Sequence, residues 1–329
     1  MRELIRKLVE TSGPSGFEER IREVIRTEVE GLVDEVRVTP LGSLVAVRAG
    51  SGQGRRIMLA AHMDEIGVMV THVDEKGFLR FAPLGGVFPI NCVGSRVRFE
   101  NGTLGVIGVE EKREDDDKIP RLDQLYLDVG ASGRADCLLR VGDAAVFERP
   151  FAVQGRRLVS KAMDDRIGCA VLIETLRRLK QRRVPNELHV VFTVQEETTF
   201  SGARTAAYSI EPDLGIAVDI TGTGDTPECY PMAVELGKGP AVKVQDQGLI
   251  AHPMVRELLI AAAEAAQVPV QMEVLERGAT DATVIQIARA GVPSGCLSIP
   301  CRYGHTPSEM VDEEDVEGAV RVMVKAVTM

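Results

Sequence analysis

Several short segments carry residue types that bind metal ions or activate water, and each follows an apolar run. The first is His62-Met63-Asp64, directly after the run RIMLAA at 56–61. Residues two apart in an extended chain face the same side, so Asp64 could accept a hydrogen bond from one ring nitrogen of His62 while the other nitrogen binds a metal ion. For this pair alone, a surface or core ion pair is the simpler alternative.

Two pairs of adjacent carboxylates follow further along the chain. Asp164-Asp165 lies between an extended segment and an expected helix, where it could bind cations or simply cap the helix. Glu196-Glu197 follows the run VVFTVQ, and two neighbouring carboxylates repel each other unless a positive charge lies between them. One could then bind a metal ion while the other takes a proton from water. This requires the strand to have ended, and a capping pair is the alternative.

Two more candidates come from strand ends in the second half of the chain. Asp219 ends the apolar run that begins at Leu214, and an ionised aspartate there needs a partner. His305 lies in IPCRYGHTPSE. The alternatives are a turn aspartate, which is also our interpretation of Asp225, and an ordinary loop histidine. The remaining histidines lack such a context and are expected to be structural: His72, His189 and His252.

Together these segments supply two histidines and three carboxylates at predicted strand ends. Ligands of open α/β sheets bind at the carboxyl ends of the strands. Imidazole nitrogen with carboxylate oxygen suits zinc, cobalt or manganese. The candidate ligands are His62, Asp164, Glu197, Asp219 and His305.

The elements that must position these residues alternate between strands and helices. Apolar periodicity predicts strands at 56–61, 187–195, 214–220 and 294–300, and a hairpin over 35–48. Helices are predicted at 2–11, 16–31, 165–181, 201–208, 253–267, 280–290 and 312–327. This alternation predicts a mostly parallel α/β sheet with helices on both faces.

The pattern changes between about residues 67 and 149. Short β-rich runs alternate there with Gly, Pro, Asn and Asp, which predicts an inserted small β domain or β-barrel. The catalytic domain would then consist of 1–66 and 150–329. The charged run at 110–118 inside the insert is expected to be a solvated loop.

Composition excludes several classes of protein. The 329-residue chain has a net charge of −10, which disfavours nucleic-acid partners. It contains no run of about 18 apolar residues, so no membrane span is expected, and its N-terminus lacks the apolar centre of a signal peptide. Six scattered cysteines without a C-x-x-C pair fit free thiols in a reducing compartment. We therefore expect a cytoplasmic protein.

Several motifs in order make the chain resemble the glutamyl-aminopeptidase family of dinuclear metallopeptidases, whose best-known members form tetrahedral assemblies. The motifs that carry the resemblance are SGPSGFEE at 12–19, AAHMDEIG at 60–67, KAMDDR at 161–166, VQEE at 194–197, GATDA at 278–282 and IPCRYGHTPSE at 299–309. Four places depart from the usual family pattern, and none of them is a candidate ligand: TTFSGA at 198–203, TGTGDTP at 221–227, Cys301 and GGVF at 85–88.

The resemblance implies a role for each matching residue. Glu196 would be the general base, and Asp64 would be the partner of His62. The ligands would form two sets that share Asp164 as a bridge: His62, Asp164 and Asp219 for one metal ion, and Asp164, Glu197 and His305 for the other.

The resemblance also implies an activity and an assembly. Two divalent ions, zinc or cobalt, would support removal of N-terminal residues from short peptides with a free amino end. The insert would be an oligomerisation domain, and the assembly a homo-oligomer such as a tetrahedral dodecamer.

Three other functions compete with this one. A metal-dependent deacylase would cleave N-acylated amino acids, and a catalytically weak scaffold would keep the fold without the activity. A glycosidase with two acidic groups would leave both histidines without a role, and a chain with no Trp lacks the flat platforms that sugars usually need.

Overall fold

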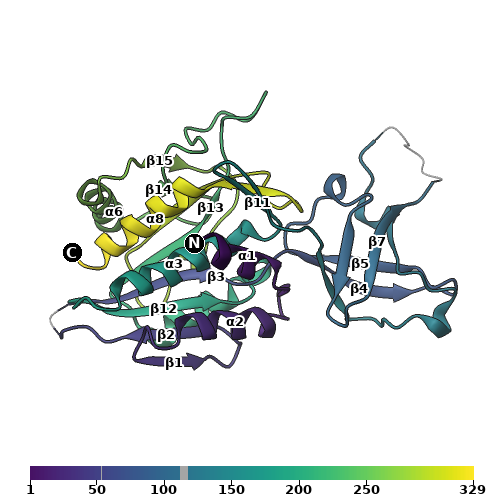
Figure 1. Cartoon of the computed structure of the whole chain (residues 1–329), viewed down its shortest axis with the longest axis horizontal. Coiled ribbons are helices and arrows are strands. Elements are labelled where there is room, and N and C mark those ends of the chain that lie inside the picture. The colour runs from purple at the N-terminus through teal and green to yellow at the C-terminus, as the bar shows by residue number, and fades with distance from the viewer. Residues whose placement is uncertain (53, 112–117) are drawn as a thin grey trace.

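The computed structural model describes residues 1–52, 54–111 and 118–329, which form a large sheet flanked by helices and a separate closed barrel (Figure 1). The strands of the large sheet run in the order β1-β2-β12-β3-β13-β16-β17-β11-β10, with β14 and β15 joined beside β16. No helix of the described residues is long and apolar enough to cross a membrane.

Four parallel strands form the centre of the sheet, as the sequence predicts. They are β12 (Glu187–Thr193), β3 (Arg56–His62), β13 (Leu214–Thr221) and β16 (Ser294–Arg302). Because they are parallel, their carboxyl ends meet at one edge, where His62 ends β3 and Asp219 lies near the end of β13. This edge carries the candidate site.

Most of the outer strands pair antiparallel, so the sheet is mixed. The expected hairpin is present, as β1 (Glu35–Val38) and β2 (Leu44–Arg48). Strand β11 (Arg157–Ser160) is the extended segment expected before Asp164. The sequence did not predict the remaining strands, which are β10 (Ala152–Gln154), β14 (Ala241–Gln245), β15 (Gln271–Val274) and β17 (Glu309–Asp312).

Helices cover both faces of the sheet because side chains alternate along its strands. In β3, Ile57 and Leu59 pack with one group of helices, while Met58 and Ala60 pack with the other. The first group is α1 (Arg2–Glu10), α2 (Glu19–Val29), α3 (Met163–Leu179), α6 (Pro253–Ala266) and α8 (Glu313–Ala326). The second is α5 (Ser201–Ile210) and α7 (Ala282–Ile285).

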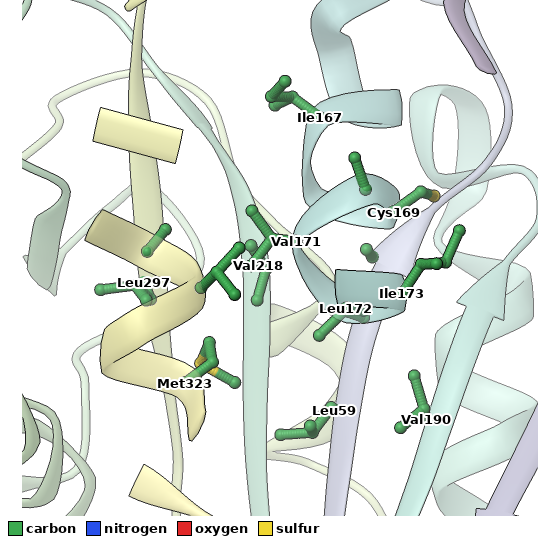
Figure 2. Close-up of a cluster of buried hydrophobic side chains, with 14 of the residues drawn as sticks. Leu59, Ile167, Cys169, Val171, Leu172, Ile173, Val190, Val218, Leu297 and Met323 are labelled. Carbon is green, nitrogen blue, oxygen red and sulfur yellow. The ribbon is translucent and has the colours of Figure 1, made fainter. Parts of the chain in front are cut away.

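Helix α3 forms the centre of the larger core. Figure 2 shows Leu172 facing Leu59 of β3, and Val171 facing Val218 of β13. All four side chains are at most 1% exposed. Burying a Leu or Val side chain is worth about 1.5–3 kcal/mol, so these contacts fix α3, and with it Asp164, against the strand ends.

One helix prediction is wrong in extent. A helix was expected over 280–290, but α7 covers only Ala282–Ile285. Arg289 has a left-handed φ of 56°, and the carbonyl of Gln286 accepts the amide of Val292. The apolar side chains still pack beside α5, without a continuous helix.

The β-rich middle of the chain forms a closed six-stranded barrel in the order β4-β5-β8-β7-β6-β9. Each strand matches one of the expected runs, and pairing of β4 with β9 closes the barrel, so that no edge is left open. The barrel strands are β4 (Gly67–Val73), β5 (Leu79–Leu84), β6 (Arg96–Phe99), β7 (Leu104–Val109), β8 (Leu125–Asp128) and β9 (Ala144–Phe147). Of the charged run at 110–118, residues 112–117 lie outside the described part of the chain.

Candidate active site

The carboxylate of Asp164 lies between the two candidate histidines. Its Oδ1 is 3.0 Å from Nε2 of His62, and its Oδ2 is 3.2 Å from Nε2 of His305. The same nitrogen of His305 is 3.5 Å from Oε2 of Glu197. Nε2 of His62 is 4.0 Å from Oδ1 of Asp219. All five candidate ligands therefore converge on one carboxylate.

The two aspartates of the Asp164-Asp165 pair face different ways. Both have a non-helical backbone, so the regular part of α3 begins after them. Oδ1 of Asp165 accepts the amide of Gly168, and its Oδ2 accepts the amide of His62 at 3.3 Å. Asp165 therefore caps the helix, which is one of the alternatives considered from the sequence, while Asp164 faces the two histidines.

The two glutamates come after the end of their strand. Strand β12 ends at Thr193, and the short helix α4 (Glu196–Thr199) begins with the pair. Oε2 of Glu196 lies 3.8 Å from Nε2 of His62. Glu196 therefore lies beside His62, whereas Glu197 lies beside His305.

Asp64 holds these glutamates in place. Its carboxylate accepts the amide of Glu196 at 3.0 Å, the amide of Glu197 at 3.2 Å, and the hydroxyl of Ser15 at 2.6 Å. Nδ1 of His62 lies 3.1 Å from the main-chain oxygen of Asp64 and 3.5 Å from its Oδ1. Asp64 is thus beside His62, as expected, and it also caps α4, which the sequence did not indicate.

Buried negative charge dominates the site. Burial, together with neighbouring carboxylates, raises the pKa values of Glu196 and Asp219 well above the usual range. Burial and the charge of Asp164 raise the pKa of Glu197 to about 7. Burial would also raise the pKa of Asp164, but hydrogen bonds from His305 and His62 outweigh it and hold that pKa below its ordinary value.

The donor set fits divalent cations. Buried carboxylates at this density need protons or cations to offset their charge. Oε1 of Glu197 is buried and has no hydrogen-bond partner among the described residues, so it has an open coordination position. Imidazole nitrogens and carboxylate oxygens are ligands for zinc and related ions. Two groups of potential ligands are close enough to share an ion: His62, Asp164 and Glu197, and His62, Glu196 and Asp219.

Glu309 is a buried residue of the site that the sequence interpretation missed. Its Oε1 accepts the amide of His305 at 2.9 Å, and its Oε2 accepts the amide of Asp164 at 3.0 Å. One carboxylate thus joins the main chains of two candidate ligands. The only signal in the sequence was its position four residues after His305 in HTPSE.

A second missed group ties the N-terminus to the site. The guanidinium of Arg166 is fully buried and donates to the carbonyls of Leu8, Thr11 and Met63. It also contacts Glu65, which pairs with the buried Lys161. These bonds fix the end of α1 against the strand that carries His62.

Buried Asp281 of GATDA was likewise given no role. Its Oδ2 accepts the hydroxyl of Thr193, the last residue of β12. Burial raises the pKa of Asp281 to about 6, although the Thr193 hydrogen bond opposes this shift.

The aspartate and the three histidines that were expected to be structural lie outside this cluster. Asp225 pairs with the guanidinium of Arg302, and this hydrogen bond lowers the pKa of Asp225. His189 contacts Glu187, and the side chain of His252 caps α6. His72 lies on the barrel strand β4. These positions agree with structural roles.

Comparison of the chain with known proteins identifies its family. The model for M42 glutamyl aminopeptidase matches residues 42–322. A protein of Acetivibrio thermocellus, provisionally named an aminopeptidase, is 48% identical over 99% of this chain and 98% of its own length. The lysyl aminopeptidase of Pyrococcus furiosus is 35% identical over 97% of this chain and 94% of its own.

Solved structures agree with the sequence comparison. An aminopeptidase of Desulfurococcus kamchatkensis superposes with a TM-score of 0.95 at 39% identity, covering 99% of this chain and 94% of that one. The TET1 peptidase of Pyrococcus horikoshii, described as able to assemble into a tetrahedron or a large octahedral shell, gives 0.90 at 31% identity, covering 99% and 98%. The chain therefore belongs to the M42 glutamyl aminopeptidase family, and it is a hydrolase of peptide bonds.

Proposed function

We propose that this protein is a two-metal aminopeptidase that releases N-terminal residues from short peptides. The observation that carries the proposal is the Asp164 carboxylate, whose two oxygens each face a different histidine nitrogen at 3.0 and 3.2 Å. A carboxylate so placed can be shared by two cations. Capping by Asp165 leaves Asp164 free for this role.

The ligands divide into two sets around the shared carboxylate. His62 and Asp219 would complete one metal site, and Glu197 and His305 the other. Zinc or cobalt fits these donors best. When bound, the ions supply Lewis-acid chemistry, lowering the pKa of water and polarising the scissile carbonyl.

Glu196 would move the protons. Its carboxylate lies 3.8 Å from Nε2 of His62 in the first ligand set, and Asp64 fixes its main chain. In this role it takes a proton from the attacking water and passes one to the leaving amine. Cleavage by an aminopeptidase also requires a free α-amine, which the cluster of carboxylates can attract.

The experiment that tests the proposal is hydrolysis of free-amine aminoacyl p-nitroanilides and tripeptides. The protein is stripped with a chelator and then supplied with zinc, cobalt or manganese. We expect activity only after metal is returned, and none on matched N-acetylated substrates. Preferential cleavage of the acetylated substrates would instead identify a deacylase. Full metal occupancy without turnover would identify an inactive scaffold.

We also propose that the chain acts as a cytoplasmic homo-oligomer assembled through its barrel. The barrel exposes large apolar side chains, such as Leu138 at 82% and Ile90 at 64%, and all six cysteines are free. The relative from Pyrococcus horikoshii, which has the same fold, can assemble into a tetrahedron or a large octahedral shell. We expect light scattering to give a mass of several chains for the wild type and a smaller mass for Leu138→Asp. Ile250→Asp, at 74% exposure and outside the barrel, is the control.

A further inference from the structure

The barrel contacts the candidate metal site through two glycines. The Gly85–Gly86 bend follows β5 and lies against Glu197 and His305, the residues of the second proposed metal site. A Cβ at Gly86 would be 2.1 Å from Nδ1 of His305 and 2.5 Å from its Cε1. A Cβ at Gly85 would be 2.8 Å from Oε2 of Glu197. Real Cβ atoms do not approach other atoms this closely, so a side chain at either position would force His305 or Glu197 to move.

Neighbouring residues continue this contact. Val87 is anchored in the core of the barrel, which holds the bend in position. The ring of Phe88 is tilted by 32° against the imidazole of His305, with 6.3 Å between the ring centres. Nδ2 of Asn91 donates to the main-chain oxygen of His305 at 3.5 Å. The barrel therefore contacts His305 on both its ring and its backbone.

His305 needs such support because its own segment is not regular. It lies in the loop between β16 and β17 and has a left-handed φ of 58°, a conformation that non-glycine residues adopt rarely and at a cost. Glu309 fixes its amide from one side. The ring is a third exposed and depends on its neighbours for its orientation.

We propose that Gly86, with Phe88, is a positioning element of the second metal site. The barrel backbone fills the space behind the imidazole and directs Nε2 toward Asp164 and Glu197. The inference rests on the proposed function, because it assigns His305 to a metal ion. It adds that the barrel helps to build this site within each chain.

Gly86→Ala tests the proposal through metal binding. The added methyl group must displace the ring, and loss of support around a metal ligand typically weakens metal affinity about 10–100-fold. We expect mass spectrometry and calorimetry to show two tightly bound ions per chain in the wild type. In the variant, the affinity for one of the two ions should be lower by this factor. Gly133→Ala is the matched barrel control, since its Cβ would meet nothing nearer than 3.4 Å and its φ of 178° is ordinary extended backbone.

A double-mutant cycle separates a local effect from a general one. Once His305→Ala has removed the ring, Gly86→Ala should change neither metal binding nor the unfolding midpoint further. If Gly86→Ala does not fold, Phe88→Ala replaces it, because this ring is 54% exposed and its loss does not open the core. Its control is Ile250→Ala, outside the barrel, at 74% exposure.

The outcomes distinguish the two proposals. A wild-type protein that binds fewer than two ions would overturn the proposed function. A wild type with two ions, and variants at Gly86 or Phe88 that bind both as tightly, would leave the function intact and overturn the positioning role. The positioning role would also be overturned if the variants lost affinity for both ions equally, and if this loss persisted in the His305→Ala background.

Discussion

At the scale of single residues, Glu309 shows how the site depends on a side chain that need not touch a metal ion. Glu309→Gln keeps the shape but replaces one accepting oxygen with an NH2 group, so either the amide of Asp164 or that of His305 loses its partner. An unsatisfied buried donor costs about 1–3 kcal/mol. We expect urea unfolding to show a loss of this size. An unchanged midpoint would mean that water replaces the lost bond.

Glu196→Gln separates catalysis from metal binding. The amide has nearly the same size and cannot accept a proton from water, so turnover should fall about 10²–10⁴-fold. Both metal ions should remain bound, because neither proposed ligand set includes Glu196. Steady-state kinetics with metal analysis on the same sample tests this. A fully active variant would contradict the role of Glu196 as the base.

At the scale of elements, Gly168 reverses an ordinary expectation. Replacing a helical glycine with alanine usually stabilises a helix by about 1 kcal/mol. Here, however, a Cβ would lie 2.4 Å from Oδ2 of Asp165, the carboxylate that caps α3. We expect Gly168→Ala to lower the unfolding midpoint. In an Asp165→Ala background this penalty should disappear, and its persistence would place the clash elsewhere.

The elements that the sequence predicted well are those whose signals are local. The parallel strands and long helices follow from apolar periodicity, and strand ends marked the candidate ligands correctly in space. Strands such as β14 and β15 escaped prediction because each is short and its partner lies far along the chain. The capping of α4 by Asp64 and the roles of Glu309 and Arg166 escaped prediction for a related reason. Their hydrogen bonds join distant segments, and no spacing in the sequence marks them.

At the scale of the whole molecule, the charge of the site couples stability to pH. Burial raises the pKa of Glu197 to about 7 from an ordinary 4.5. The folded metal-free chain then binds more protons than the unfolded chain between these values, so its free energy of unfolding falls as the pH rises through this window.

Bound cations take the place of those protons, and metal binding therefore releases protons. We expect the increase in unfolding temperature caused by metal to be larger at pH 8 than at pH 5. Calorimetry on chelated and metal-loaded protein at both pH values measures it. An increase that is equal at both, or larger at pH 5, would contradict this protonation scheme. Glu197→Gln should reduce the difference.

The bonds of Arg166 also have a consequence for synthesis on the ribosome. Helix α1 is synthesised before its partner, because Arg166 follows Leu8 by 158 residues and Thr11 by 155 residues. His305 follows later still. A nascent chain can therefore build the anchor of its first helix only after Arg166 has been made, and the proposed set of metal ligands only after His305 has been made.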